Sequence, residues 1–389
     1  MQQASLNGVI NQNALATTFA RPAPGYVLGW SVDPAHHDSA HDRSTRRALA
    51  ERLASLKGYR YFGEVGGAAP PPGPLFYVPS DTIAGRELAH SMGIRQESDL
   101  FGGVVPFPYV ATKAISHPLF GLDAAAPEGW VSSFAECIRH CVLDGFTAFS
   151  EADARRAGHW LLRGGSVRIK PVRATGGHGQ TAVSDAASLD RVLAELPGIA
   201  TDGVVLERNL REPRTLSVGQ VTVGDLRVSY YGLQREVRNH RGESVYGGSD
   251  LTAVRGGLET LHAMPLSRDL HLAIEQARAY HAAVVDSFPG FMASRINYDV
   301  AQGLDDAGQW RSGVLEQSWR IGGASGAEIA ALEAFRDQPQ RKLVRASCFE
   351  VFGDPPTLPP GACVYHDGVD SRVGRLVKYS FVEPHVDPT

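Results

Sequence analysis

The chain is poor in lysine, cysteine and methionine, and it contains no long apolar run. No apolar segment reaches the roughly 18 residues that a membrane-spanning helix needs, so we expect no membrane partner. Its four cysteines form no CxxC pair, which favours a reduced, cytoplasmic protein over one stapled by disulfides. The net charge of −4 shows no basic excess, so we expect no nucleic-acid partner.

The motifs of several enzyme classes are missing as well. The sequence has no Gly-Lys-Ser/Thr phosphate loop and no GxGxxG followed by an acidic residue about 20 positions later. It also lacks HExxH and the GxSxG turn of many hydrolases. These absences exclude the common nucleotide-binding loops and give no support to a nucleophilic serine or cysteine.

The composition is that of a globular protein, with 43% hydrophobic and 21% charged residues. A length of 389 residues predicts two to three domains at about 150 residues per domain. Residues 1–24 are expected to form a flexible tail. In residues 25–110, candidate strands at Tyr26–Val32 and Leu75–Val78 alternate with candidate helices at Ser44–Lys57 and Thr82–Met92. This alternation predicts a small open α/β domain.

The middle of the chain carries further clear patterns. Thr215–Val223 and Leu226–Val237 read as the strands of a hairpin around Gly224-Asp225. The clearest helix is Ser267–Val285, with apolar residues at helical spacing. Residues 239–257 show no periodicity and are expected to be irregular.

One glycine-rich loop follows a strand that ends on a lysine. Ser166–Pro171 is an apolar strand with Lys170 near its end, and Gly176, Gly177 and Gly179 follow it. The ammonium could meet a phosphate while the glycine backbone closes over phosphate oxygens with its N–H groups. The alternative is a lysine that reaches solvent in front of a flexible loop.

Two later strands place polar side chains on one face each. Alternation predicts one row of Arg295, Asn297 and Asp299, and a second row of Glu316, Ser318 and Arg320. If the strands pair, oxygen ligands suited to Mg²⁺ converge with guanidinium groups suited to a phosphoryl group. The alternative is a solvated sheet face.

The order of these features along the chain resembles that of the ATP-grasp superfamily, which includes D-alanine–D-alanine ligase, biotin carboxylase and carbamoyl-phosphate synthetase. The resemblance covers roughly residues 110–330 and points to an uncharacterised branch. It implies an ATP-grasp domain at 111–330, a lid at about 125–208, and a C-terminal extension at 331–389 packed on the core. The fold class expected is α/β, an α+β ATP-grasp core with the small α/β domain in front.

The resemblance also implies roles for particular residues. ATP would be held by Lys113 and Lys170 at the phosphates, by Gly176, Gly177 and Gly179 in the lid loop, by Glu207, Arg208 and Leu210 at the adenine, and by Glu212 at the ribose. Mg²⁺ would be held by Asn297, Asp299, Glu316 and Ser318. Arg295 and Arg320 would be catalytic, stabilising the acyl phosphate and the species that follows it.

The implied reaction is an ATP- and Mg²⁺-dependent ligation, in which a substrate carboxylate becomes an acyl phosphate and an amine, or less often a thiol, displaces phosphate. The partners would be ATP, a small carboxylic acid and a small amine, and a homodimer is left open. Two departures favour the alternative of a non-catalytic, regulatory ATP-binding protein. Asn297 stands where the family usually has Asp, Glu or Gln, and Ser318 where it usually has Asn. Asp299 could take over one metal.

Three further features have competing interpretations. His36 to Asp42 is dense in metal-ligand types, but it also reads as a polar loop or a substrate contact. Cys137 and Cys141 share a predicted helix face and are expected to be buried thiols. A hairpin strand carries four residues that could line a substrate pocket or an ordinary sheet face: Tyr230, Tyr231, Gln234 and Arg235.

Overall fold

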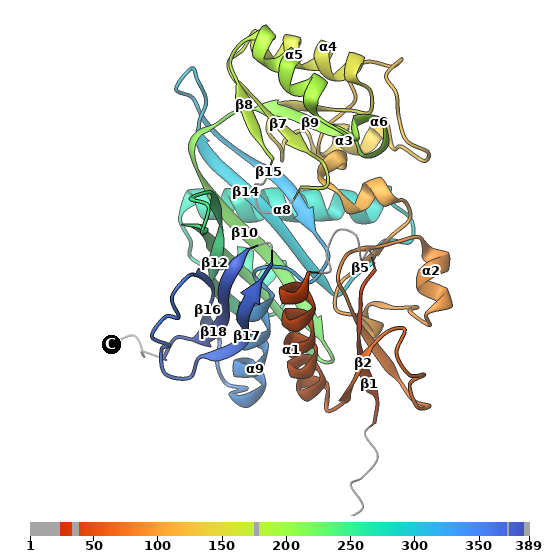
Figure 1. Ribbon diagram of the computed structural model, residues 1–389, viewed down its shortest axis with the longest axis vertical. Coiled ribbons are helices and arrows are strands. Elements are labelled where there is room, and N and C mark those ends of the chain that lie inside the picture. Colours follow the sequence, from red (N-terminus) through yellow and green to blue (C-terminus); the bar gives the residue numbers. More distant parts are fainter. Residues whose placement is uncertain (1–23, 33–38, 175–178, 372, 385–389) are drawn as a thin grey trace, which may run out of the picture.

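The computed structural model describes residues 24–32, 39–174, 179–371 and 373–384. Its largest element is an antiparallel eight-stranded sheet in the order β15-β14-β10-β11-β12-β16-β18-β17 (Figure 1). The strands are β10 (Arg211–Val223), β11 (Leu226–Arg238), β12 (Ser244–Arg255), β14 (Arg295–Leu304), β15 (Trp310–Ser318), β16 (Leu343–Phe352), β17 (Cys363–Asp370) and β18 (Gly374–Val382). The part of the chain after residue 331 therefore supplies three strands of this sheet.

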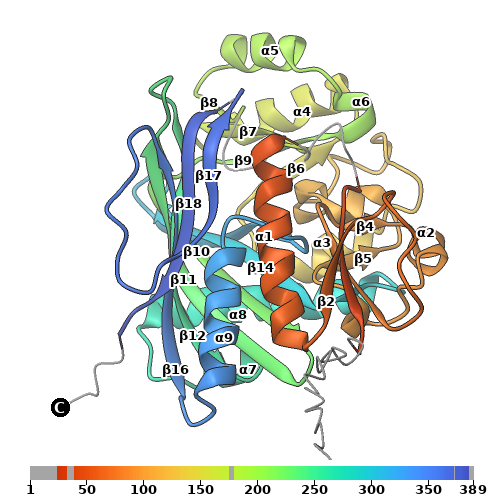
Figure 2. The ribbon, with the colours of Figure 1, turned by 60° about the horizontal axis from the view of Figure 1, so that its bottom comes forward.

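Helices cover both faces of the large sheet. Helix α8 (Arg268–Ser287) packs on one face, together with α7 (Leu258–His262) and α3 (Ser132–Ile138). Helices α1 (Ala40–Lys57) and α9 (Ser325–Asp337) lie side by side on the opposite face (Figure 2). Strand β10 shows the alternation that this requires, because Leu216 and Val218 face α8 whereas Val221 and Val223 face α1 and α9.

The N-terminal part forms a smaller α/β unit beside the large sheet. Its parallel sheet has the order β2-β1-β3, with β1 (Tyr26–Trp30), β2 (Arg60–Glu64) and β3 (Leu75–Pro79). A second small sheet joins β4 (Ile83–Ala84), β5 (Gly103–Val105) and β13 (Met292–Ala293), next to α2 (Arg86–Ser91). Three short 3₁₀ helices follow or connect these elements: η1 (Glu97–Asp99), η2 (Pro108–Ala111) and η3 (Lys113–Ser116).

The lid, which we define as residues 145–208, is a separate layer at the top of Figure 1. It contains a four-stranded antiparallel sheet in the order β6-β9-β7-β8 and three helices with their own apolar core. These elements are β6 (Gly145–Ala148), α4 (Glu151–Leu162), β7 (Val167–Pro171), β8 (Thr181–Val183), α5 (Ala186–Glu195), α6 (Ile199–Asp202) and β9 (Val204–Arg208). The hairpin between β14 and β15 reaches up beside the lid, where the N–H of Ser166 donates to Asp306 Oδ2.

Some expected boundaries are wrong. Helix α1 begins at Ala40, where the Ser39 hydroxyl accepts from the Asp42 N–H, rather than at Ser44. The helix expected over 82–92 shrinks to α2, because Gly85 takes a positive φ of 106°. Residues 244–255 are a regular strand, with a bulge near Gly248 that hides the period. No helix in the described ranges is long and apolar enough to cross a membrane.

Candidate active site

The floor of the candidate site is the pairing of β14 with β15. In this antiparallel pair, Asp299 lies opposite Glu316, and Asn297 lies opposite Ser318. Residues directly opposite in such a pair point to the same face of the sheet. The two polar rows predicted from the sequence therefore form one cluster, which lies next to the lid because Lys170 Nζ is 3.5 Å from the carbonyl oxygen of Leu315.

Glu316 is surrounded by cationic groups from other elements. Its Oε2 lies 2.6 Å from Lys113 Nζ, which also donates to the carbonyl oxygen of Ala174 in the lid at 2.7 Å. Burial alone would raise the pKa of Glu316, but the charges of Lys113 and Lys170 outweigh it and hold the pKa below its usual range. Glu316 is therefore an ionised carboxylate in the absence of any ligand.

Asp299 behaves in the opposite way. Burial and the neighbouring Glu316 carboxylate raise its pKa, although it accepts hydrogen bonds from Ser217 Oγ at 3.1 Å and Asn297 Nδ2 at 2.9 Å. Two facing carboxylates whose charges oppose each other form a set that a divalent cation would stabilise. In the described part of the chain no group of three or more His, Cys, Asp or Glu side chains gathers around a metal position. Two carboxylates nevertheless fit Mg²⁺, which keeps waters and shares phosphate oxygens.

Asn297 and Ser318 lie beside these carboxylates with their oxygens in use. The Tyr230 hydroxyl donates to Asn297 Oδ1 at 3.0 Å, and Arg295 Nη1 donates to Ser318 Oγ at 3.1 Å. Asn297 therefore contacts Asp299 directly, whereas Ser318 is held by Arg295. Their metal-binding role remains a prediction.

A buried chain of three charged or polar residues lies at the base of the lid. Lys170 Nζ is 3.0 Å from Glu207 Oε1, and Glu207 Oε2 is 3.1 Å from His117 Nε2. Burial opposes ionisation of Glu207, but Lys170 and His117 lower its pKa to about 2. The Glu207 carboxylate thus has two protein partners, and its role at the adenine remains a prediction. His117 Nδ1 is buried and has no hydrogen-bond partner among the described residues.

The two predicted catalytic arginines have different surroundings. Arg295 is 2% exposed, and its Nε and Nη2 lie 3.0 and 2.8 Å from the two carboxylate oxygens of Glu328 in α9. Burial would lower its pKa, but the Glu328 charge raises it above its ordinary value. The side chain of Arg320 is 21% exposed, and its Nε is 3.7 Å from Asp81 Oδ1. Of the two, Arg320 is the one that can meet a ligand.

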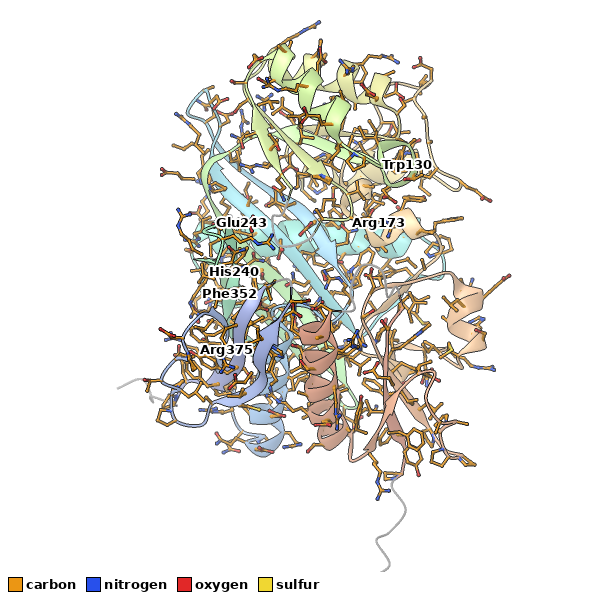
Figure 3. The ribbon with its side chains drawn as sticks, viewed as in Figure 1. Trp130, Arg173, His240, Glu243, Phe352 and Arg375 are labelled. Atoms are coloured by element: carbon orange, nitrogen blue, oxygen red, sulfur yellow. The ribbon has the colours of Figure 1, made fainter. Side chains whose placement is uncertain are left out.

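A cleft of about 590 Å³, counting the space open to solvent, lies beside these groups, whereas Lys170, Glu207 and Asp299 do not line it. It lies where the lid, the N-terminal unit and the large sheet meet, and Figure 3 labels Arg173 on its lid side. Its lining residues are Asp81, Thr82, Ala111, Thr112, Lys113, Val172, Arg173, Ala174, Glu316, Gln317, Ser318 and Arg320. The cleft therefore brings the ammonium of Lys113, the carboxylate of Glu316 and the partly exposed guanidinium of Arg320 to one place.

A family described as "Protein of unknown function (DUF3182)" matches residues 30–380. The chain belongs to this family. No curated protein matches it in sequence. Solved structures with a similar fold are nonetheless known, and two of them are compared with this chain below.

One similar structure is N5-carboxyaminoimidazole synthetase from Staphylococcus aureus, with 9% identity, a TM-score of 0.51 and coverage of 93% of this chain and 94% of that one. Another is carboxyaminoimidazole ribonucleotide synthase from Aspergillus clavatus, solved with ATP, with 14% identity, a TM-score of 0.50 and coverage of 92% and 94%. Both are ATP-grasp ligases, and this chain has the ATP-grasp fold. The predicted α/β class and the resemblance in the sequence are confirmed, while identities this low leave the reaction to be argued from the site.

Several predicted ATP-binding residues of this DUF3182 chain lie outside the cleft or outside the described ranges. Gly176 and Gly177 fall outside the described residues, and Gly179 has a φ of +67°. Glu212 is exposed at the start of β10 with a φ of +44° and does not line the cleft. Arg208 donates to the carbonyl oxygen of Gly164 within the lid.

Leu210 lies behind the polar cluster. It is buried in a small apolar group with Leu143 and Ala301, against which Leu315 packs. Leu315 is the residue before Glu316, so this group is the apolar surface adjacent to the charged one.

The cysteine pair and the histidine-rich segment, the other features singled out in the sequence, lie away from the cleft. Cys141 is buried as expected, but Cys137 is exposed. His36 lies outside the described residues, and His41 Nδ1 is 3.2 Å from Asp370 in β17. The metal site considered for this segment gains no third acidic, His or Cys ligand among the described residues.

The four hairpin residues divide between the two faces of the sheet. Tyr230 is fully buried below the cleft, and Gln234 Nε2 donates to Ser217 Oγ beside Asp299. Tyr231 packs in the core on the α8 side, and Arg235 stacks over Phe349 at 4.1 Å. None of the four lines the cleft.

Sequence reasoning missed two supporting residues, His117 and Glu328. His117 stands in a Ser-His-Pro stretch without a recognisable motif. Glu328 lies 33 positions after its partner Arg295, on a helix that reads as an ordinary amphipathic one. Neither position carries a local signal, because both act through contacts made by the tertiary fold.

Proposed function

We propose that the protein is an ATP- and Mg²⁺-dependent ligase that activates a substrate carboxylate as an acyl phosphate for attack by an amine. One observation carries this proposal: two buried ammonium groups, Lys113 and Lys170, and the opposed carboxylates Asp299 and Glu316 gather around Glu316 at the edge of the cleft in an ATP-grasp fold. Ligases of this type need charge neutralisation and positioning rather than a nucleophilic side chain.

Lys113 and Lys170 are the groups that would bind phosphates. In the structure each is neutralised by a carboxylate, Glu316 for Lys113 and Glu207 for Lys170. When a nucleotide and its cation bind, a phosphate can replace the carboxylate at Lys113, while Glu316 turns to the cation. The buried charges would then stay balanced in both states, as burial in a low-dielectric site requires.

Asp299 and Glu316 would hold Mg²⁺, with phosphate oxygens and waters completing its shell. The bound ion would neutralise the phosphate charge that builds up during transfer. Lys113 and Lys170 lower the pKa of Glu316 and so keep one ligand ionised beforehand, whereas burial and the Glu316 charge raise the pKa of Asp299. Asn297 orients Asp299 through its hydrogen bond, and Ser318 is itself oriented by Arg295.

The adenine would lie against the apolar group formed by Leu143, Leu210, Ala301 and Leu315, next to the backbone of residues 208–210. Arg320, which faces the cleft, is the group placed to stabilise the acyl phosphate. Arg295, which is held by Glu328, would keep Ser318 and the end of β15 in position.

Calorimetric titration of ATP with and without Mg²⁺ tests the proposal. Lys170→Ala should lose at least about tenfold in affinity, because hydrogen bonds to charged groups contribute about 1.5–3 kcal/mol. Glu316→Ala should lose the Mg²⁺ dependence of binding. A folded wild type that binds no ATP would overturn the proposal.

The ion pair between Lys378 and Glu350 offers matched controls. Its 3.0 Å separation and partial burial resemble the pairs of the cleft, but neither residue lines it. Lys378→Ala and Glu350→Ala should therefore bind ATP like the wild type. A wild type that binds Mg·ATP tightly, yet releases no ADP with a broad set of acids and amines, would favour the non-catalytic alternative.

A further inference from the structure

His117 is a fully buried, titratable side chain at the base of the lid that the proposed ligase mechanism does not use. The backbone on both sides of it is fixed to β6. The Thr147 hydroxyl donates to the carbonyl oxygen of Ala114 at 2.7 Å, and the Thr147 N–H donates to that of Pro118 at 2.9 Å. A Cβ at Gly145 of β6 would come within 2.8 Å of His117 Nδ1, so the imidazole packs where the neighbouring strand has no side chain.

The geometry of the pair that His117 forms with Glu207 fixes its hydrogen. Burial opposes ionisation of Glu207, but Lys170 and His117 lower its pKa to about 2, and an ionised carboxylate only accepts hydrogen bonds. In the 3.1 Å contact between His117 Nε2 and Glu207 Oε2, the hydrogen is therefore on Nε2.

The other ring nitrogen of His117 explains why the side chain is neutral in the ligand-free protein. Nδ1 is buried and has no hydrogen-bond partner among the residues that the structure describes. A second proton on Nδ1 would therefore make a buried donor without an acceptor, which is unfavourable. While Lys170 neutralises Glu207, no net negative charge offsets this cost.

Nucleotide binding would change the balance at the two lysines in different ways. The partner of Lys113 is Glu316, and in the proposed site Mg²⁺ arrives with the phosphates, so this carboxylate gains a cation. The partner of Lys170 is Glu207, which does not line the cleft and would gain no metal. Whether Lys170 leaves Glu207 or is shared with a phosphate, its single charge would then face two anions. A buried carboxylate that loses its cation is strongly destabilising.

We propose that His117 is a positioning residue that supplies the missing charge, so that binding of the nucleotide is coupled to uptake of one proton by His117. This inference rests on the proposed ligase function. The proton comes from the buffer and binds the lone pair of Nδ1, while the Nε2–H stays on Glu207. The imidazolium then keeps Glu207 in place when Lys170 turns to the phosphate.

The surrounding charges favour this assignment. Glu207 on β9 faces His117 directly, and Lys170 on β7 lies on the far side of that carboxylate. Lys113, at the start of η3, is engaged by Glu316 of β15 instead. Because the nucleotide-bound protein would hold one more proton than the free protein, affinity for Mg·ATP falls as pH rises through the range in which His117 titrates.

Calorimetric titration of the full chain with Mg·ATP at about pH 8, in two buffers of different ionisation enthalpy, counts the protons exchanged. The second pKa of a phosphate group is about 6, so the nucleotide itself takes up none at this pH. We expect a net uptake of about half a proton or more, and an affinity that falls by up to about tenfold per pH unit between about pH 7 and pH 9. ATP binding without proton uptake would overturn the inference, whereas a wild type that binds no ATP would instead defeat the proposed function.

Variants assign the proton to His117. His117→Gln keeps an amide donor for Glu207 but cannot take a proton, so it should abolish the uptake and flatten the pH dependence of affinity. A purely structural role would instead lower affinity equally at every pH. The matched control is His159→Gln, which removes an exposed lid histidine paired with Asp190 at 3.0 Å and should keep both the uptake and the pH dependence.

Lys170→Ala gives a second test that does not depend on the folding of His117→Gln. Without the lysine, Glu207 needs the His117 cation before the nucleotide arrives, so the uptake should be lost although ATP still binds weakly. Uptake that survives in His117→Gln or in Lys170→Ala, or that is lost equally in His159→Gln, would contradict the inference.

Discussion

The two halves of the large sheet use the same face in opposite ways. On β12 and β16, this face presents Leu251, Ala253 and Ala346 to helices α1 and α9, which cover it in Figure 2. On β14 and β15, it carries Asp299 opposite Glu316, and Glu316 lines the cleft beneath the lid. Where helices cover the sheet permanently, the face is apolar and contributes to stability. Under the lid, it holds charges that need partners.

The two halves of the sheet contribute to the free energy of folding with opposite signs. Burial of apolar surface against α9 stabilises the fold at about 25 cal/mol per Å². The facing pair of Asp299 and Glu316 works against folding, as the raised pKa of Asp299 shows. Lys113 and Lys170 offset part of that cost. The apolar, helix-covered half of the sheet therefore provides the stability that offsets the cost of the charged half.

The largest effect is expected at the border between the two halves, where Arg295 meets Glu328. Arg295→Ala should cost about 3–5 kcal/mol of unfolding free energy, because it leaves Glu328 buried without its cation. Urea denaturation measures this loss. A double variant, Arg295→Met with Glu328→Met, should recover most of it.

The matched comparison is Arg320→Ala, which removes a partly exposed guanidinium and should cost less than about 1 kcal/mol. If Arg295→Ala instead kept full stability and lost only turnover, Arg295 would be catalytic, as the resemblance implies. That outcome would contradict a structural role for its ion pair with Glu328.

The next effect lies wholly in the helix-covered half. Leu332 in α9 is fully buried against the sheet, so Leu332→Ala should cost about 2–5 kcal/mol. ATP affinity, measured by calorimetry well below the unfolding temperature, should stay within twofold of the wild type. A large loss of affinity in a folded Leu332→Ala protein would show that the two halves are coupled.

The residues where the two halves of the sheet meet illustrate what the sequence could and could not predict. Strand alternation places Asp299 and Glu316 on matching faces, since a period of two is a local property. The partner of Arg295 depends on where α9 lands, which no local pattern states. Strand β12 was hidden because Gly247 and the bulge at Gly248 interrupt the alternation. His117 was missed for the same reason as Glu328, since its role exists only after the lid folds back onto it.

The smallest expected effect is a gain in stability at the charged end of the sheet. Because the pKa of Asp299 is raised in the folded protein, its contribution to stability is present at low pH and is lost as pH rises through that pKa. Asp299→Asn removes the buried charge and keeps acceptors for Ser217 and Asn297. At neutral pH without Mg²⁺ it should stabilise the protein by no more than about 2 kcal/mol.

Melting curves between about pH 4 and pH 8 would show this gain growing with pH, since the wild type alone loses stability as Asp299 ionises. Addition of Mg·ATP should then raise the melting temperature of the wild type more than that of Asp299→Asn. A variant that is less stable at every pH, and that responds fully to Mg·ATP, would contradict both the electrostatic cost and the cation site. We expect Asp299→Asn to melt at a higher temperature than the wild type and to respond less to Mg·ATP. That result would show that the Asp299 carboxylate lowers stability but is needed to bind the ion.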